Sequence, residues 1–162
     1  VRRGRFHNSF GSEGTWDGGR EKAPAAMCRK AILTKDGGEM EVWGNGLQTR
    51  SFLYIDECIE AVFRLMNSNF KEPVNIGSEE MISINNFAKM AINISGKNIQ
   101  IKNLDGKEFE EKYGFPTPLG VKGRNSDNNL YRTNVGWEPS MPLIEGMQKT
   151  YKWIESETKK SK

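Results

Sequence analysis

The 162-residue sequence predicts an α/β fold, and three observations support this prediction. Short apolar runs of strand type alternate with longer stretches whose apolar residues recur at helical spacing. Glycine and proline separate these stretches, as they do between secondary-structure elements. Charged residues make up 28% of the chain and aromatic residues 10%, a composition typical of globular domains. The strands are nevertheless too few and too short to form a complete nucleotide-binding sheet.

The first third of the chain predicts strands around one long loop and one helix. Residues 1–7 indicate a strand, and residues 8–21 indicate a glycine-rich loop. Residues 23–33 predict a helix, because a proline in the first turn occupies a position whose N–H would be unpaired anyway. Residues 39–43 and 49–53 are short alternating runs. The sequence GNG between them predicts that the two strands pair as a hairpin, since these residues accept positive φ.

The middle of the chain predicts two helices separated by a strand. Asp56 precedes an apolar periodic stretch and predicts a helix to about residue 67, with its carboxylate capping the first turn. Residues 74–76 indicate a short buried strand. Ser83 predicts the start of the next helix, and Gly96 lies just beyond its expected end.

The last third is less regular until its end. Residues 99–101 indicate a strand and residues 105–113 a helix, which the prolines at 116 and 118 must stop. From residue 142 the apolar positions repeat at helical spacing and predict a closing helix.

Charge and composition exclude several classes of function. Lys and Arg number 24 against 21 Asp and Glu, and no basic stripe with interleaved aromatic residues occurs, so we expect no nucleic-acid binding. No apolar run approaches the roughly 20 residues of a membrane helix, so we expect a soluble chain without a membrane segment. Cys28 and Cys58 lie in apolar helical stretches and are interpreted as small buried hydrophobic residues. They predict neither a disulfide nor a metal site, and they fit a reducing compartment.

Three basic residues are candidates for chemistry. Lys22 ends the glycine-rich loop at a helix start, where the helix dipole and any desolvation would favour its neutral form and a general acid/base role. The alternative is an exposed lysine beside Glu21. Arg50 and Arg124 could together hold a diphosphate through charged forks, or each could be a surface ion-pair residue. No Gly-x-Gly-x-x-Gly turn follows a strand, so any cofactor phosphate site lies elsewhere.

Four runs carry a resemblance to a known family. They are GRFHN at residues 4–8, GTWDGGREKAPAA at 14–26, WGNGLQTRSF at 43–52 and GRNSDNN at 123–129. Together they resemble the GDP-mannose 3′,5′-epimerases of the extended short-chain dehydrogenase class. The resemblance implies the C-terminal part of such an enzyme, an incomplete Rossmann sheet plus a small α/β substrate domain. Residues 1–19 would be the end of the NAD-binding Rossmann part with the substrate loop. Residues 20–162 would be the substrate domain, with elements that pack back on the Rossmann part.

The resemblance also implies a reaction. NAD would transiently oxidise the sugar at C4, and an acid/base pair would then invert C3 and C5, converting GDP-mannose to GDP-L-galactose in a cytoplasmic homodimer. In the family this pair is a cysteine and a lysine. The lysine matches Lys22, the cysteine lies upstream of this chain, and Cys28 and Cys58 match non-catalytic positions. We therefore expect this chain alone to be inactive. The GDP-sugar-binding positions of the family match Asn8, Glu21, Lys22, Ala23, Lys30, Gln48, Thr49, Arg50 and Arg124.

The chain also departs from the family pattern. Arg3 stands at an apolar strand position, so we expect the first strand to be frayed or displaced there. Ser9, Phe10 and Ser12 differ from the usual residues, and residues 108–118 are expected to be an insertion that affects where Arg124 lies. Two alternatives stay open. One is another nucleotide-sugar epimerase, dehydratase or decarboxylase, and the other is a truncated, non-catalytic module for sugar-nucleotide binding or dimerisation.

Overall fold

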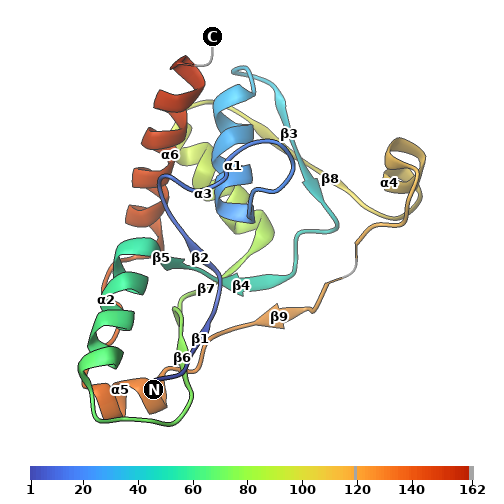
Figure 1. The fold of residues 1–162 in the computed structure, drawn as a ribbon. Coiled ribbons are helices and arrows are strands. Elements are labelled where there is room, and N and C mark those ends of the chain that lie inside the picture. The colour runs from blue at the N-terminus through green and yellow to red at the C-terminus, as the bar shows by residue number, and fades with distance from the viewer. Residues whose placement is uncertain (119, 161–162) are drawn as a thin grey trace.

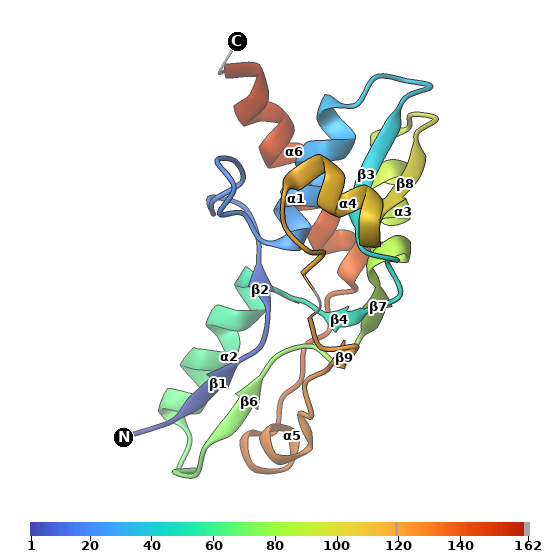
Figure 2. The same ribbon diagram turned by 90° about the vertical axis from the view of Figure 1, so that its right-hand side faces the viewer.

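The structure, a computed structural model, describes residues 1–118 and 120–160. Its elements form two groups, joined by a narrow middle region (Figures 1 and 2). The first group contains α1 (Ala23–Leu33), β3 (Glu39–Trp43), α3 (Ile84–Ser95), β8 (Gln100–Leu104) and α6 (Leu143–Lys160). The second contains β1 (Gly4–Phe6), α2 (Ile55–Asn67), β6 (Val74–Ile76) and α5 (Asn129–Val135). The short strands between them are β2 (Ser9–Phe10), β4 (Thr49–Ser51), β5 (Leu53–Tyr54), β7 (Met81–Ser83) and β9 (Gly123–Arg124).

The larger core lies where α1, α3 and α6 pack together beside β3 and β8 (Figure 1). Phe87 on α3 and Met147 and Ile154 on α6 are fully buried there. Burying a side chain of this size contributes about 1.5–3 kcal/mol. This helical layer therefore fixes the first turn of α1, which carries one of the candidate site residues.

The predicted hairpin of residues 39–43 and 49–53 is wrong. β3 pairs with β8 in parallel, from Glu39 opposite Gln100 to Trp43 opposite Leu104. β4 pairs instead with β7 in antiparallel and with β9 in parallel. Gly44 and Gly46 do adopt positive φ, as expected of a turn, but the chain turns away from β3 instead of folding back along it. A turn signal specifies local backbone geometry and leaves the strand partner open.

The second group is a small parallel sheet covered by α2. β1 pairs with β6, and Cys58, Ala61 and Leu65 of α2 pack against Val74 and Ile76 of β6. The side chain of Arg3 is exposed and β1 begins at the next residue, although the Arg3 carbonyl still accepts a hydrogen bond from the Val74 amide. The strand is therefore paired up to this position, and the arginine side chain avoids burial.

The predicted ends of α3 are confirmed, whereas the predicted cap of α2 is not. Ser83 caps α3 by accepting a hydrogen bond from the Asn86 amide, and Gly96 ends this helix in the left-handed conformation, as predicted. The prediction that Asp56 caps α2 is wrong, because the helix follows β5 directly and its N-cap position is Tyr54. Asp56 lies inside the first turn, where a carboxylate still interacts favourably with the helix dipole.

The region predicted as an insertion contains a short helix, α4 (Gly106–Tyr113), capped by Asp105. In Figure 1 it lies at the outer edge of the molecule, beyond β3 and β8, and Figure 2 shows it from that side, in front of the other helices. Its inner residue Phe109 is fully buried against Trp43 of β3, with ring centroids 5.2 Å apart. Of the helices described here, none combines the length and apolarity required to cross a bilayer.

Candidate functional site

A cavity of about 700 Å³ lies in the middle region, between the two groups of elements. Four of the residues predicted to bind substrate line it, and they come from three segments of the chain: Asn8, Lys22, Ala23 and Arg50. The Asn8 side chain donates a hydrogen bond to the Ser51 carbonyl at 3.1 Å, and its own carbonyl accepts one from the Leu53 amide at 3.0 Å. These two bonds fix the segment after β1 against β4 and β5.

Lys22 is the N-cap residue of α1, so its position follows from where the helix begins. The Lys22 carbonyl accepts the first helical hydrogen bond, from the Ala26 amide at 3.0 Å. Pro24 occupies the first turn, as the sequence predicts. The side chain of Lys22 lines the cavity and is exposed, so the expected desolvation is not present in this chain. A general acid/base role there requires additional walls around the ammonium group.

Arg50 and Arg124 are brought together, although 73 residues separate them in the sequence. β4 and β9 run parallel, and these two arginines are direct register partners. Register partners in a sheet project to the same face, so the two side chains lie side by side, but only Arg50 of the two lines the cavity. Gly120 approaches Arg50 so closely that a Cβ atom there would lie 3.2 Å from its Nη2 atom.

Glu21 does not line the cavity. Its side chain is 6% exposed and accepts a hydrogen bond of 2.6 Å from Arg29 on α1. Burial alone would raise the pKa of Glu21, but hydrogen bonds from its own amide and from Arg29 lower it below the usual value. Within the described structure, Oε2 of this buried carboxylate has no hydrogen-bond partner. Glu21 thus anchors the end of the glycine-rich loop on α1.

Lys30, Gln48 and Thr49 also lie outside the cavity lining. The Lys30 ammonium donates a hydrogen bond of 2.8 Å to the Glu41 carbonyl of β3, and burial lowers its pKa. The Gln48 carbonyl accepts a hydrogen bond from the Ile84 amide. Thr49 neighbours Arg50 along β4, so its side chain points to the opposite face of the strand. For these residues the structure gives structural contacts, and a direct role in binding stays a prediction.

Sequence reasoning missed several residues of the cavity wall. Phe52 and Ile84 supply apolar surface, and Ser9 and Cys58 lie beside them. The Ser9 hydroxyl donates to the Cys58 sulfur at 3.3 Å. The period of two along β4 could have identified Phe52, because it follows Arg50 by two residues. Nothing local in the sequence distinguishes Ile84 or Cys58 from other core residues. Both cysteines are buried and free, as predicted, and burial raises the pKa of Cys28 to about 12.

The described residues contain no glycine-rich turn of the kind that binds a dinucleotide pyrophosphate. The glycine-rich segment between β2 and α1 is an exposed loop, and no helix described here begins on a Gly-x-Gly-x-x-Gly turn. Residues 1–118 and 120–160 also contain no group of three or more His, Cys, Asp or Glu side chains that could hold a metal ion. The site therefore offers basic and amide groups over an apolar floor, an arrangement suited to an anionic polar ligand.

Comparisons with known proteins agree with this geometry. The fold is similar to the UDP-glucose 4-epimerase of Thermotoga maritima, solved with UDP-glucose, with a TM-score of 0.79 and 22% identity over 96% of this chain and 46% of the other. It is also similar to the UDP-glucuronic acid 4-epimerase of Bacillus cereus, solved with UDP-glucuronic acid and NAD. That match has a TM-score of 0.75 and 24% identity over 94% of this chain and 44% of the other.

These likenesses show the fold and confirm the predicted fold class, the C-terminal part of an α/β fold shared with nucleotide-sugar epimerases. A family model described as GDP-mannose 4,6 dehydratase matches residues 5–150, and the chain belongs to that family. A protein named GDP-mannose 3,5-epimerase from Arabidopsis thaliana is 52% identical over 162 residues, which confirms the resemblance carried by the glycine-rich loop. The match covers 100% of this chain and 40% of that relative, so the chain spans well under half of the relative's length.

Proposed function

We propose that this chain is the substrate-binding part of a GDP-mannose 3,5-epimerase that converts GDP-mannose to GDP-L-galactose in a homodimeric, cytoplasmic enzyme. The observation that carries the proposal is the cavity in which Asn8, Lys22 and Arg50 meet. Amide and ammonium groups suit the hydroxyls of a hexose, and the paired arginines suit a diphosphate. NAD would supply the oxidation at C4, held by the part of the longer protein outside this chain. Lys22 would then move a proton at C3 or C5 of the sugar.

The proposed cofactor-binding part needs a surface on which to pack, and α2 offers one. Ile59, Phe63 and Met66 of α2 and Phe6 of β1 are 61 to 67% exposed, while other apolar residues of α2 are buried against β6. A helix that is apolar on both sides is normally buried on both sides. In the part of the chain described, β1 also pairs with β6 alone, which leaves one edge of β1 open. We therefore propose that β1, β6 and α2 belong to the sheet layer shared with the cofactor-binding part.

We expect the isolated chain to show no epimerase activity, because neither a dinucleotide site nor a complete acid/base pair is present among its residues. The measurement is incubation with GDP-mannose and NAD, followed by chromatography of the nucleotide sugars. A chimera, in which this chain replaces the aligned 162 residues of the Arabidopsis thaliana relative, is expected to form GDP-L-galactose. A folded chimera without turnover would contradict the proposed function, and turnover by the isolated chain would contradict the proposed division of roles.

The two arginines provide a binding test on the isolated chain. Arg50→Ala and Arg124→Ala should each weaken GDP binding by about 1.5–3 kcal/mol, because each removes a charge-assisted partner of the diphosphate. Calorimetry at low and high salt is the measurement, and the loss should shrink as salt rises. Arg64→Ala is the matched control, an exposed arginine paired with Glu60 on α2. Equal affinity of both variants and the wild type for GDP would refute the assignment of the diphosphate.

A further inference from the structure

Arg124 lies on a strand that has little support of its own. β9 is two residues long, and all residues from 120 to 125 are exposed. This segment is attached to β4 by the short pairing of Thr49 with Gly123 and of Arg50 with Arg124, and by a hydrogen bond from the Thr49 amide to the Lys122 carbonyl, at 2.9 Å. A two-residue strand on an open edge is not stable by itself. The position of Arg124 beside Arg50 must therefore depend on what anchors the neighbouring chain.

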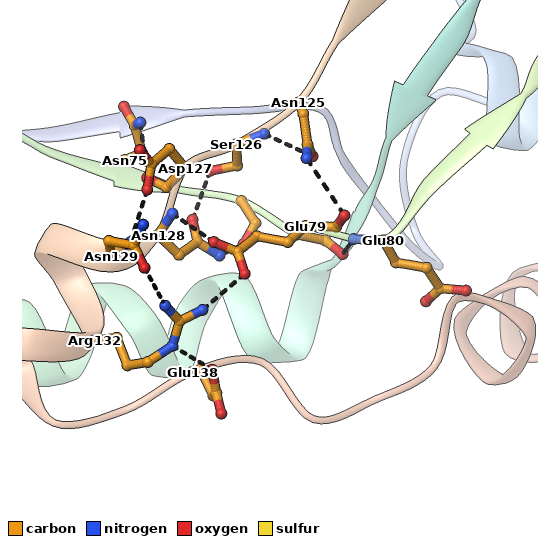
Figure 3. A network of polar contacts seen from close by, with 12 residues as sticks. Asn75, Glu79, Glu80, Asn125, Ser126, Asp127, Asn128, Asn129, Arg132 and Glu138 are labelled. Carbon is orange, nitrogen blue, oxygen red and sulfur yellow. Dashed lines mark hydrogen bonds and ion pairs between the residues drawn. The ribbon is translucent and has the colours of Figure 1, made fainter.

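The anchor begins two residues after Arg124. Ser126 and Asn128 are only 2% and 4% exposed. The Ser126 hydroxyl donates to Oδ1 of Asn128 at 2.6 Å, and Nδ2 of Asn128 donates to the Gly77 carbonyl at 2.8 Å (Figure 3). Both polar groups of the Asn128 side chain are thus used inside the protein. Removing either partner would leave a buried polar group unsatisfied.

The anchor also lies directly behind the cavity wall. A Cβ atom added to Gly77 would lie 2.7 Å from Cβ of Ser126 and 2.8 Å from Cβ of His7. Glycine at this position therefore leaves room for both Ser126 and His7 to pack against it. His7 lines the cavity together with Asn8. A shift of the segment around Ser126 would consequently move the cavity wall at His7 as well as Arg124.

An outer ring of charges surrounds this anchor (Figure 3). Glu79 accepts a hydrogen bond from the Asn128 amide at 2.9 Å and an ion pair from Arg132 at 2.7 Å. Arg132 in turn contacts Glu138 at 2.5 Å. The three charged side chains are 36 to 58% exposed, and exposed pairs of this kind contribute little. The buried pair of Ser126 and Asn128 therefore provides most of the restraint.

We infer that Asn128 and Ser126 are positioning residues that hold Arg124 in register with Arg50, so that the two guanidinium groups act on one diphosphate. Neither residue would touch the ligand in this arrangement, because both are buried and neither lines the cavity. The identity of the ligand, a diphosphate, rests on the proposed function. The positional part of the inference, that Ser126 and Asn128 hold Arg124 beside Arg50, rests on the contacts alone.

The positional part is tested by hydrogen–deuterium exchange on the 162-residue chain without ligand. Asn128→Ala should speed exchange at the Thr49 amide by about tenfold or more, because β9 loses its anchor. The Gly44 amide, which donates to the Leu104 carbonyl between β3 and β8, should be unchanged. Asn134→Ala is the matched control, since this exposed asparagine bonds only within its own helix in the described contacts.

Asn128→Ala could instead speed exchange throughout the chain. In that case the same measurement is made on Ser126→Ala, which removes a single hydrogen bond. Unchanged exchange at Thr49 in a folded Asn128→Ala or Ser126→Ala variant overturns the inference.

The functional part is tested with a double-mutant cycle read by GDP affinity. Arg124→Ala and Asn128→Ala should each weaken GDP binding by about tenfold to a hundredfold, and the double variant should bind no more weakly than Arg124→Ala alone. If Asn128 only stabilised the fold, the two losses of GDP affinity would multiply in the double variant. That result would reject the positioning role. If the wild-type chain binds no GDP, the proposed diphosphate site fails. The exchange experiment then decides the positional part by itself.

Discussion

Replacing Lys22 by alanine in the chimeric enzyme should lower the rate of proton exchange at C3 and C5 by about 10² to 10⁴, the usual contribution of a positioned general acid or base. The reason is positional: Lys22 is fixed as the N-cap residue of α1 and its side chain lines the cavity. Oxidation at C4 and binding of the GDP-sugar should be largely retained, because the arginines are untouched. The measurement is incorporation of deuterium from deuterated water, followed by NMR or mass spectrometry of the sugar.

Two further variants sharpen this prediction. Lys22→Arg should not restore exchange, because a guanidinium keeps its proton at working pH. Lys35→Ala, which removes an exposed lysine just beyond the end of α1, should exchange like the parent chimera. Exchange at both carbons of Lys22→Ala at the parent rate would mean that Lys22 only holds the substrate. The exposure of Lys22 in this chain also predicts that the cofactor-binding part must supply the walls that desolvate it.

The helices could be predicted because their signals are local. The α1 helix has the predicted residues, and the cap and end of α3 lie at Ser83 and Gly96 as predicted. Strand pairing could not be predicted in the same way. The turn at Gly44 and Gly46 favours a hairpin, yet β3 finds its partner in β8, far along the chain, because the helices pack beside that pair. Partner choice depends on tertiary packing, which no local window contains.

The candidate site shows the same limit. Residue types alone suggested that Lys22 and the two arginines could carry chemistry, but they could not show that Arg50 and Arg124 are register partners. Residue chemistry left open whether they share one site or form separate surface ion pairs, and the resemblance to a family favoured one site. Ser126 and Asn128 were not identified as anchors, because short polar residues in an asparagine-rich run resemble an exposed loop. Their burial depends on Gly77, fifty residues away in the sequence, and on the close approach of His7.

The anchor downstream of Arg124 also predicts that the short helix α4 can open without loss of the diphosphate site. An eight-residue helix is too short to be stable by itself, so α4 depends on its packing. Phe109 is fully buried, with its ring centroid 5.2 Å from that of Trp43 and 5.3 Å from that of Phe115. Glu41 adds contacts with Lys112 and Tyr113.

Phe109→Ala should therefore cost about 3–5 kcal/mol of docking free energy and leave α4 open most of the time. Hydrogen–deuterium exchange across residues 106–113 is the measurement, and exchange there should become fast while the amides of α1 and α6 stay protected. Phe115→Ala is the matched control, because this ring is 44% exposed and its loss should cost much less.

GDP affinity should be the same in Phe109→Ala and in the wild type, since Ser126 and Asn128 hold Arg124 from the other side. Protected amides in α4 of Phe109→Ala would mean that the contacts with Glu41 hold the helix. A parallel loss of GDP affinity would mean that Arg124 is positioned through the insertion.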